Sequence, residues 1–235
     1  MAGNNTASTT NPGTPGDSVL TWEERSVRRV VESGREQLLE RSRKIVEAAY
    51  ELLEEGLEEL TIRAVLAKTG LSRRAFYERF SGKDDLVLAV FEHTVRRAES
   101  HYREQIRQMT GPLDRLHLIV SWIVCGREAL AGNERENGDR RGAAMSREHL
   151  RLAESRPEEL QRALSPLIAL IAEQLSDGMA VGQVRNGDPD RLASLVYNLV
   201  STTVHTELLS PVTARADREQ LAAEIWEFCR RAVAA

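Results

Sequence analysis

Apolar residues recur along most of the chain at the spacing of one face of an α-helix. The clearest stretch runs from residue 45 to residue 53, where apolar side chains occupy positions i, i+3, i+4, i+7 and i+8. Gly56 follows its last turn and is typical of a helix C-cap. The sequence does not sustain the alternation of apolar and polar residues that marks a β-strand. We therefore expect an all-α protein.

Two short helices are predicted next. Thr61 is expected to cap the first and Ser72 the second, because a side-chain oxygen can accept a hydrogen bond from a free N–H of the first turn. Gly70 lies between them and can take the left-handed conformation that a tight turn between helices demands. Phe76 and Phe80 are expected to face the core from the second helix.

Glycine, proline and polar segments separate the remaining helices. One helix is expected to begin at Lys83-Asp84-Asp85 and to continue through Val95. The polar residues from Gly132 to Gly142 are interpreted as a loop. Further helices are predicted over residues 112–131, 146–154, 157–180, 189–209 and 214–234.

The same pattern suggests four segments. Residues 1–18 carry few apolar side chains, so burial cannot offset the entropy lost on ordering, and we expect a disordered tail. The helical pattern begins at Trp22, and Ser33-Gly34 either breaks it or merely weakens it. We place an N-terminal helical extension over residues 19–38, a domain of short helices over 39–90 and a larger helical domain over 91–235.

Composition bears on the partners of the protein. The net charge is −4, from 32 basic and 36 acidic residues, so any nucleic-acid binding requires a local patch. The two cysteines, Cys125 and Cys229, fit a reducing cytoplasm rather than a disulfide scaffold. The uncharged stretches 116–126 and 192–206 are shorter than the ~18–20 apolar residues of a membrane span. We expect a cytoplasmic protein, with no signal peptide in residues 1–18 and no membrane partner.

Positive charge concentrates on the two short helices. Residues 61–83 hold six basic side chains and one acid, whereas residues 42–60 hold six glutamates and two bases. Two short helices joined by a tight turn, with the positive face on them, are the layout of a helix-turn-helix. A solvated arginine-rich helix face is the competing interpretation. The six basic residues are Arg63, Lys68, Arg73, Arg74, Arg79 and Lys83.

The residue types suit double-stranded DNA. An arginine such as Arg73, at the start of a helix in the major groove, can donate two hydrogen bonds to guanine O6 and N7. The hydroxyl of Tyr77, one turn later, can reach a phosphate. Lys83 is expected near the start of the next helix, where its ammonium and free backbone N–H groups can together hold another phosphate. We predict that Arg73, Arg74, Tyr77 and Arg79 protrude together from one compact helical unit.

The run from Gly70 to Leu86, GLSRRAFYERFSGKDDL, resembles the signature of the tetracycline-repressor (TetR) family of transcriptional regulators. That signature is roughly G-V-S-x-G-T-L-Y-x-[HY]-F-x-[SN]-K-[ED]-x-L. The stretch RKIVEAA at residues 43–49, Gly56 and Thr61-Ile62 also resemble the first helix of that family and the start of the second. The resemblance covers residues 42–91.

The resemblance implies that residues 39–90 form a helix-turn-helix DNA-binding domain. Arg63 matches a position that often reaches a base, and Thr61 and Lys83 match phosphate contacts. The other implied positions form the exposed face of the recognition helix. The nine residues are Thr61, Arg63, Arg73, Arg74, Ala75, Tyr77, Glu78, Arg79 and Lys83.

Two departures from the family bear on the DNA sequence that is recognised. Arg74-Ala75 stands where the family often has Gly-Thr. Glu78 is the other, an acidic side chain on the same exposed face. It can accept a hydrogen bond from cytosine N4 or pair with Arg74 one turn away, and both alternatives stay open.

The resemblance also implies that residues 91–235 form a ligand-binding and dimerisation domain. Two apolar stripes can build a four-helix interface between two copies, although the same stripes can instead close the core of one chain. A homodimer suits recognition, because one short helix makes too little contact for useful specificity. The expected interface residues are Leu192, Leu195, Val196, Leu199, Leu221, Ile225 and Phe228.

A small apolar effector is expected among the central helices. The candidate pocket residues are His117, Trp122, Cys125, Met145, Met179 and Tyr197. Each of them also has an ordinary structural interpretation, and Trp122, Met179 and Tyr197 are of types that more often belong to the core than to a ligand wall. The spacings of histidine and cysteine do not suit a metal site, and we expect no metal and no cofactor.

The leading hypothesis is therefore a cytoplasmic, homodimeric transcriptional regulator of the TetR type, which we expect to be a repressor of a near-palindromic operator. One alternative is a DNA-binding regulator with no small-molecule inducer. Another is a helical enzyme or scaffold protein, but the sequence contains no recognisable catalytic constellation.

Overall fold

The computed structural model of the chain describes residues 21–56, 58–125, 135–210 and 217–235. These residues are helical throughout most of their length, and no strand occurs among them. The all-α prediction is confirmed. The chain divides into two units, residues 1–43 and residues 44–235.

Helix α1 spans Trp22–Glu55. It begins where it does because Thr21 and Glu24 form a reciprocal capping box. The Glu24 carboxylate accepts from the Thr21 N–H at 2.7 Å, and the Thr21 hydroxyl accepts from the Glu24 N–H at 3.2 Å. The helix continues through Ser33-Gly34, so the glycine weakens the helix without breaking it.

The short helices form as their caps predict. Helix α2 spans Ile62–Thr69, and the Thr61 hydroxyl accepts from the Ala64 N–H. Helix α3 spans Arg73–Tyr77, and the Ser72 hydroxyl accepts from the Ala75 N–H. Gly70 lies between them with φ of 70°, a left-handed conformation that costs a residue with a Cβ about 1–2 kcal/mol.

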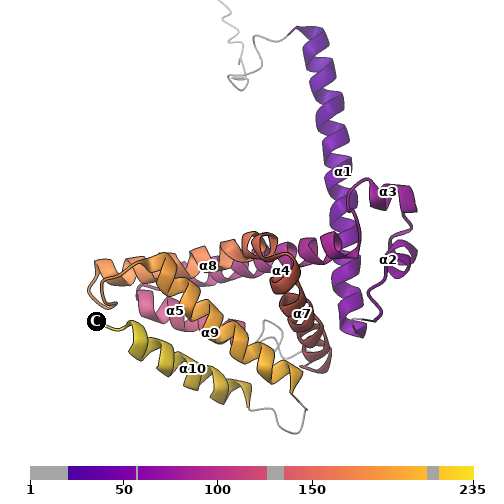
Figure 1. Cartoon of the computed structure of the whole chain (residues 1–235). Coiled ribbons are helices and arrows are strands. Elements are labelled where there is room, and N and C mark those ends of the chain that lie inside the picture. The colour runs from indigo at the N-terminus through magenta and orange to yellow at the C-terminus, as the bar shows by residue number, and fades with distance from the viewer. Residues whose placement is uncertain (1–20, 57, 126–134, 211–216) are drawn as a thin grey trace, which may run out of the picture. The chain divides into compact units, whose positions relative to one another are not determined.

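Helices α2 and α3 lie beside the C-terminal part of α1 in Figure 1, and a shared apolar core packs them against residues 44–55 of α1. Phe76 of α3, Val65 of α2 and Ile45 of α1 are all fully buried. Phe80 packs beside Phe76, with ring centroids 5.4 Å apart. Both phenylalanines therefore serve the core, as the sequence predicts.

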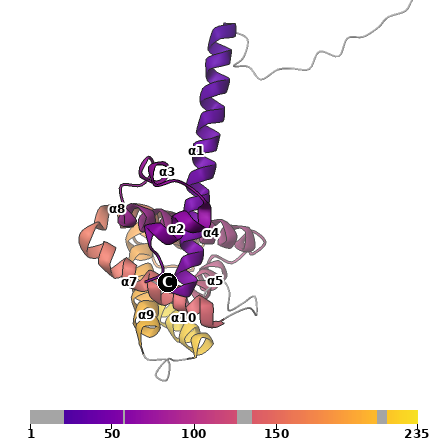
Figure 2. The same ribbon diagram turned by 90° about the vertical axis from the view of Figure 1, so that its right-hand side faces the viewer.

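The remaining helices form the body. Helix α4 packs against α8, α5 packs against α8 and α10, and α9 contacts α7 and α8. Helices α9 and α10 lie side by side in both ribbon views (Figures 1 and 2). None of the described helices is long and apolar enough to span a bilayer. The helices of the body are α4 Lys83–Ile106, α5 Pro112–Cys125, α7 Arg135–Ser155, α8 Pro157–Ala180, α9 Pro189–Leu209 and α10 Arg218–Val233.

The start of α7 differs from its prediction. Residues from Gly132 to Gly142 were expected to form a loop before a short helix at 146–154, but α7 already begins at Arg135. Within α7, Gly142 lies against α9, where a Cβ at this position would come 3.1 Å from Leu208 Cδ1. A glycine that permits close packing resembles a loop glycine in the sequence. The predicted residues 126–131 and 214–216 lie outside the described ranges.

Candidate nucleic-acid interface

The predicted DNA-contact residues lie on α2, on α3 and at the start of α4. Most of them are exposed, and Ala75 and Lys83 are half-buried. Tyr77 at the end of α3 is 55% exposed, and its ring meets the buried Phe76 ring edge to face at 5.3 Å. The core residue thus orients the exposed tyrosine. The exposed members are Thr61, Arg63, Arg73, Arg74, Tyr77 and Glu78.

Arg74 and Glu78 form an ion pair on this surface. Arg74 Nε donates to Glu78 Oε1 at 3.0 Å, and the arginine side chain is 90% exposed. A pair this exposed contributes little free energy. The pair forms in the protein without DNA. Either side chain can leave it for a contact with DNA at a small cost in free energy.

Arg79 corrects the prediction of a common exposed face. Its side chain is only 6% exposed, because α3 ends at Tyr77 and the guanidinium folds back toward the helix. Nη1 donates to the carbonyl of Ala75 and lies 3.5 Å from Glu78 Oε2. The TetR signature in the sequence analysis has histidine or tyrosine at the position of Arg79. That difference is the sequence signal that distinguishes Arg79 from an ordinary exposed arginine.

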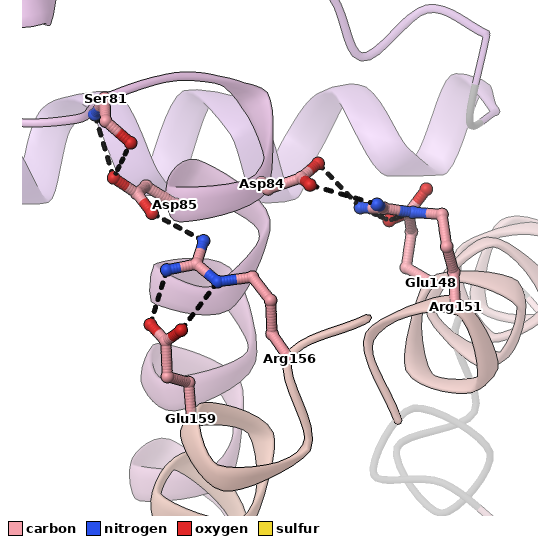
Figure 3. Close-up of polar contacts among 7 residues, drawn as sticks. All are labelled: Ser81, Asp84, Asp85, Glu148, Arg151, Arg156 and Glu159. Atoms are coloured by element: carbon pink, nitrogen blue, oxygen red, sulfur yellow. Dashed lines mark hydrogen bonds and ion pairs between the residues drawn. The ribbon is translucent and has the colours of Figure 1, made fainter. Parts of the chain in front are cut away.

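Two arginines, one on α7 and one just before α8, bind the first turn of α4 (Figure 3). The first is Arg151 of α7, whose two terminal nitrogens bind both oxygens of Asp84 at 2.8 and 3.1 Å. The buried Glu148 accepts from the same guanidinium at 2.7 and 2.9 Å. Arg151 holds the pKa of Asp84 below its usual value. This carboxylate therefore stays charged and bound to α7.

The second is Arg156, the residue before α8. Its Nη1 lies 2.5 Å from Asp85 Oδ1, and its other side contacts Glu159 (Figure 3). Asp85 also accepts from the Ser81 N–H at 2.9 Å and from the Ser81 hydroxyl. These hydrogen bonds, from Ser81 first and Arg156 second, lower the pKa of Asp85 to about 2.

The two arginines neutralise the carboxylates that flank a predicted phosphate contact. Asp84 and Asp85 directly follow Lys83, and two free acids there would repel a DNA phosphate. Sequence reasoning missed Arg151 and Arg156 because they lie 67 and 71 residues from their partners, beyond any local pattern.

Comparison with known proteins decides the class. Residues 45–90 match the family described as bacterial regulatory proteins, tetR family. The chain carries a DNA-binding segment of the tetR family. The match contains α2, α3 and the start of α4, so the predicted DNA contacts from Thr61 to Lys83 fall within the DNA-binding region of a TetR-family transcriptional regulator.

Curated relatives that are similar to this chain are uncharacterized regulators. The HTH-type transcriptional regulator Rv2250c of Mycobacterium tuberculosis (strain ATCC 25618 / H37Rv) is 25% identical over 160 residues, covering 68% of this chain and 77% of the relative. Regulator Mb2274c of Mycobacterium bovis (strain ATCC BAA-935 / AF2122/97) matches with the same identity and coverage.

Solved structures share the TetR fold over most of the chain. FadR from Bacillus subtilis, in complex with stearoyl-CoA, has a TM-score of 0.63 at 18% identity and covers 79% of this chain and 96% of its own. A putative regulator from Saccharomonospora viridis in complex with choline has a TM-score of 0.62 at 18% identity, covering 83% and 98%. A TetR-family regulator from Agrobacterium tumefaciens has a TM-score of 0.56 at 20% identity, covering 84% and 100%.

The predicted effector-pocket residues occupy different parts of the TetR body. His117 is exposed on α5, and its ring stacks on Trp226 of α10 at 4.7 Å. Trp122 stacks on Tyr102 at 4.9 Å. The Cys125 thiol, whose pKa burial raises, donates to the carbonyl of Arg218 at 3.7 Å.

The other three pocket candidates lie on α7, α8 and α9. Met145 and Met179 are half-buried against the core. Burial raises the pKa of Tyr197 to about 12, so its hydroxyl stays protonated. A cavity of about 490 Å³ lies elsewhere, between the end of α3, α4 and α8, and none of the six predicted residues lines it.

The predicted dimer stripes divide into two groups. Leu192, Val196 and Ile225 are less than 9% exposed within a single chain, which matches the alternative that these stripes close the core of one chain. They close the core of the monomer because the inner face of each helix turns toward α5 and α8. Leu195 and Phe228 are 59% and 63% exposed, and Leu199 and Leu221 are half-buried.

Proposed function

We propose that this TetR-family regulator is a ligand-responsive repressor that binds a near-palindromic operator as a homodimer. The observation that carries the proposal is the exposure of Arg63, Arg73 and Arg74, beside Tyr77, on two short capped helices joined at Gly70. These side chains present guanidinium donors and a phenol hydroxyl from a rigid support, which is what a major groove requires.

Each side chain has a distinct proposed role. Arg73, the first residue of α3, reads a guanine, and a good bidentate contact discriminates against the wrong base by about 1–3 kcal/mol. Lys83, the first residue of α4, and Thr61, the cap of α2, hold phosphates and set the register. Tyr77 holds a further phosphate.

Two copies are required for useful specificity. Helix α3 has five residues, so one recognition unit reads only a few base pairs. A second copy related by a two-fold axis doubles the contact and implies a near-palindromic site. We place the interface on the exposed side of α9 and α10, where Leu195 and Phe228 leave apolar surface uncovered.

An effector in the body is the proposed switch. The FadR structure holds stearoyl-CoA and the Saccharomonospora viridis structure holds choline, both in proteins of the same fold. A ligand that favours one separation of the two heads disfavours the operator-bound dimer in proportion to its differential affinity. A thermal-shift screen of lipophilic compounds tests this step, because a bound effector raises the melting temperature by mass action.

DNA binding is tested with fragments that the purified protein retains from its own genome, in band shifts at several salt concentrations. Arg73→Ala is expected to lose preference for the selected fragment, by about 1–3 kcal/mol. Lys83→Ala is expected to weaken binding to all sequences and to lower the salt slope by about 1. Arg107→Ala, which removes an exposed arginine paired with Glu104 at the end of α4, is the matched control. Unchanged affinity in both test variants would show that the assigned surface is wrong.

A further inference from the structure

The cavity beside the recognition helix has an unusual lining. It holds about 490 Å³ between Arg79 and Phe80 after α3, the first turns of α4 and the first turns of α8. Its walls combine apolar side chains, such as Leu88 and Ala163, with charged ones. The volume accommodates a small molecule and is separate from the predicted effector-pocket residues.

Arg79 lines this cavity and carries donors that nothing in the described chain satisfies. Its side chain is more than nine-tenths buried, and Nε and Nη2 have no hydrogen-bond partner among the described residues. Unpaired donors on a buried guanidinium are unfavourable, because these groups have lost their hydrogen bonds to water and gained none within the protein. A buried orphan of this kind is commonly explained by an ion or molecule that completes its hydrogen bonds.

Arg162 adds a second cation to the same lining. It is exposed on the first turns of α8, and its Nε makes only a long hydrogen bond of 3.4 Å, to the carbonyl of Glu158. It has no carboxylate partner among the described residues. Arg162 can therefore turn toward an anion in the cavity without breaking an ion pair.

The carboxylates of the lining are already engaged. Asp85 and Glu159 both bind Arg156, and Glu92 accepts from Arg96. Their charges are thus balanced within the wall. The donors that stay available belong to Arg79 and Arg162, and both prefer an oxyanion.

We propose that this cavity is a binding site for a small oxyanion, a carboxylate or phosphate group carried by a compact molecule, held between Arg79 and Arg162. The site goes beyond the proposed apolar effector. Its occupant contacts Arg79, which lies two residues after the recognition helix. It also contacts α4 and α8, the two helices that the Arg156 ion pairs join. Binding therefore stabilises the packing of the recognition helix against α4 and α8.

The test is thermal unfolding of the full chain at constant ionic strength, without DNA. Inorganic phosphate and butyrate are titrated separately against chloride. We expect a saturable rise in melting temperature with one or both probes, and about tenfold or more weaker apparent affinity in Arg162→Ala. A rise with phosphate alone assigns the site to phosphoryl ligands, and a rise with butyrate alone assigns it to carboxylates with an apolar chain. A rise with each of the two probes assigns it to the oxyanion chemistry that they share.

Matched variants locate the binding. Arg79→Gln is expected to lose the rise as well, and Arg162→Ala keeps the test valid if Arg79→Gln does not fold, because Arg162 is a surface residue. Arg73→Ala and Arg107→Ala remove exposed arginines outside the cavity and are expected to keep the rise. The proposal is overturned by an equal rise in Arg162→Ala, by loss of the rise in Arg73→Ala, or by no saturable rise with either probe. None of these outcomes bears on operator binding.

Discussion

His205 of α9 and His149 of α7 lie against each other inside the body. Their ring centroids are 4.5 Å apart, and His149 also faces Phe91 of α4 at 6.0 Å. Burial, and secondarily the neighbouring His149, lower the pKa of His205 from 6.5 to about 4, and burial lowers that of His149. Both imidazoles are therefore neutral in the folded protein at pH 7.

This pair predicts a pH dependence of stability. In the unfolded chain His205 takes up a proton below its ordinary pKa of 6.5, whereas the folded protein resists protonation down to about 4. The stability is thus complete above pH 6.5 and falls between pH 6.5 and 4, by on the order of 2 kcal/mol. Urea unfolding at pH 7 and pH 5 should show this loss, and His205→Gln should reduce it. His117→Gln, exposed on α5, is the control, and an identical slope in His205→Gln would refute the assignment.

Glu78 gives a second prediction for a single residue. Its negative charge lies on the proposed DNA face and is paired with Arg74. Glu78→Gln is expected to tighten binding to all DNA sequences several-fold at low salt, because it removes repulsion and releases Arg74. Band shifts with operator and unrelated DNA measure this. Weaker binding to the operator alone would instead mean that Glu78 accepts a hydrogen bond from a base.

Among the elements, the turn between α2 and α3 depends on a single glycine. Gly70 has φ of 70°, and no atom lies within 4 Å of the position that a Cβ would take. The cost of Gly70→Ala is therefore a backbone cost, about 1 kcal/mol in the free energy of unfolding. Gly70→Asn should cost less, because asparagine tolerates the left-handed conformation. Equal losses in both variants, measured by urea unfolding, would contradict this explanation.

The attachment of α4 to α8 can be measured as a coupling energy. A double-mutant cycle of Arg156→Gln and Asp85→Asn is expected to give about 1 kcal/mol at pH 7, because both side chains are mostly buried, at 25% and 28% exposure. The Arg103–Glu173 pair joins the same two helices but is about half exposed, so its cycle should give a coupling near zero.

The Asp85 contribution is present above its ordinary pKa of 3.8 and is lost as the pH falls toward 2. A coupling for Arg156 and Asp85 no larger than that of the control would show that this link is weak.

At the scale of the whole molecule, the proposed dimer and its interface on α9 and α10 can be tested. Phe228→Glu is expected to convert the proposed dimer to monomers and to lower operator affinity by orders of magnitude, because a charge replaces a buried apolar contact and each half-site then binds alone. Sedimentation velocity and band shifts measure the two effects. Leu150→Glu, at a 52% exposed leucine on α7, is the matched control and should leave the dimer intact. A Phe228→Glu protein that stays dimeric places the interface elsewhere.

Local signals in the sequence carried much of the fold. Thr61 and Ser72 cap α2 and α3, and Gly70 turns between them, because each acts through backbone groups within four residues of itself. The proline-led helices α8 and α9 begin and end at their predicted residues for the same reason. The signature around residues 70–86 indicated the tetR family because the recognition helix is built from these same local features.

Tertiary structure decided what depends on residues far apart in the chain. It turned Arg79 inward, assigned Leu192 and Ile225 to the monomer core and joined Asp85 to Arg156. The sequence by itself determined most of the helical segments and where the recognition unit lies, because helix caps, turns and apolar periodicity act over a few residues. Which face of each helix is covered, and which charges meet, followed only from the packing of helices that are distant in the sequence, since burial and ion pairing depend on position in space.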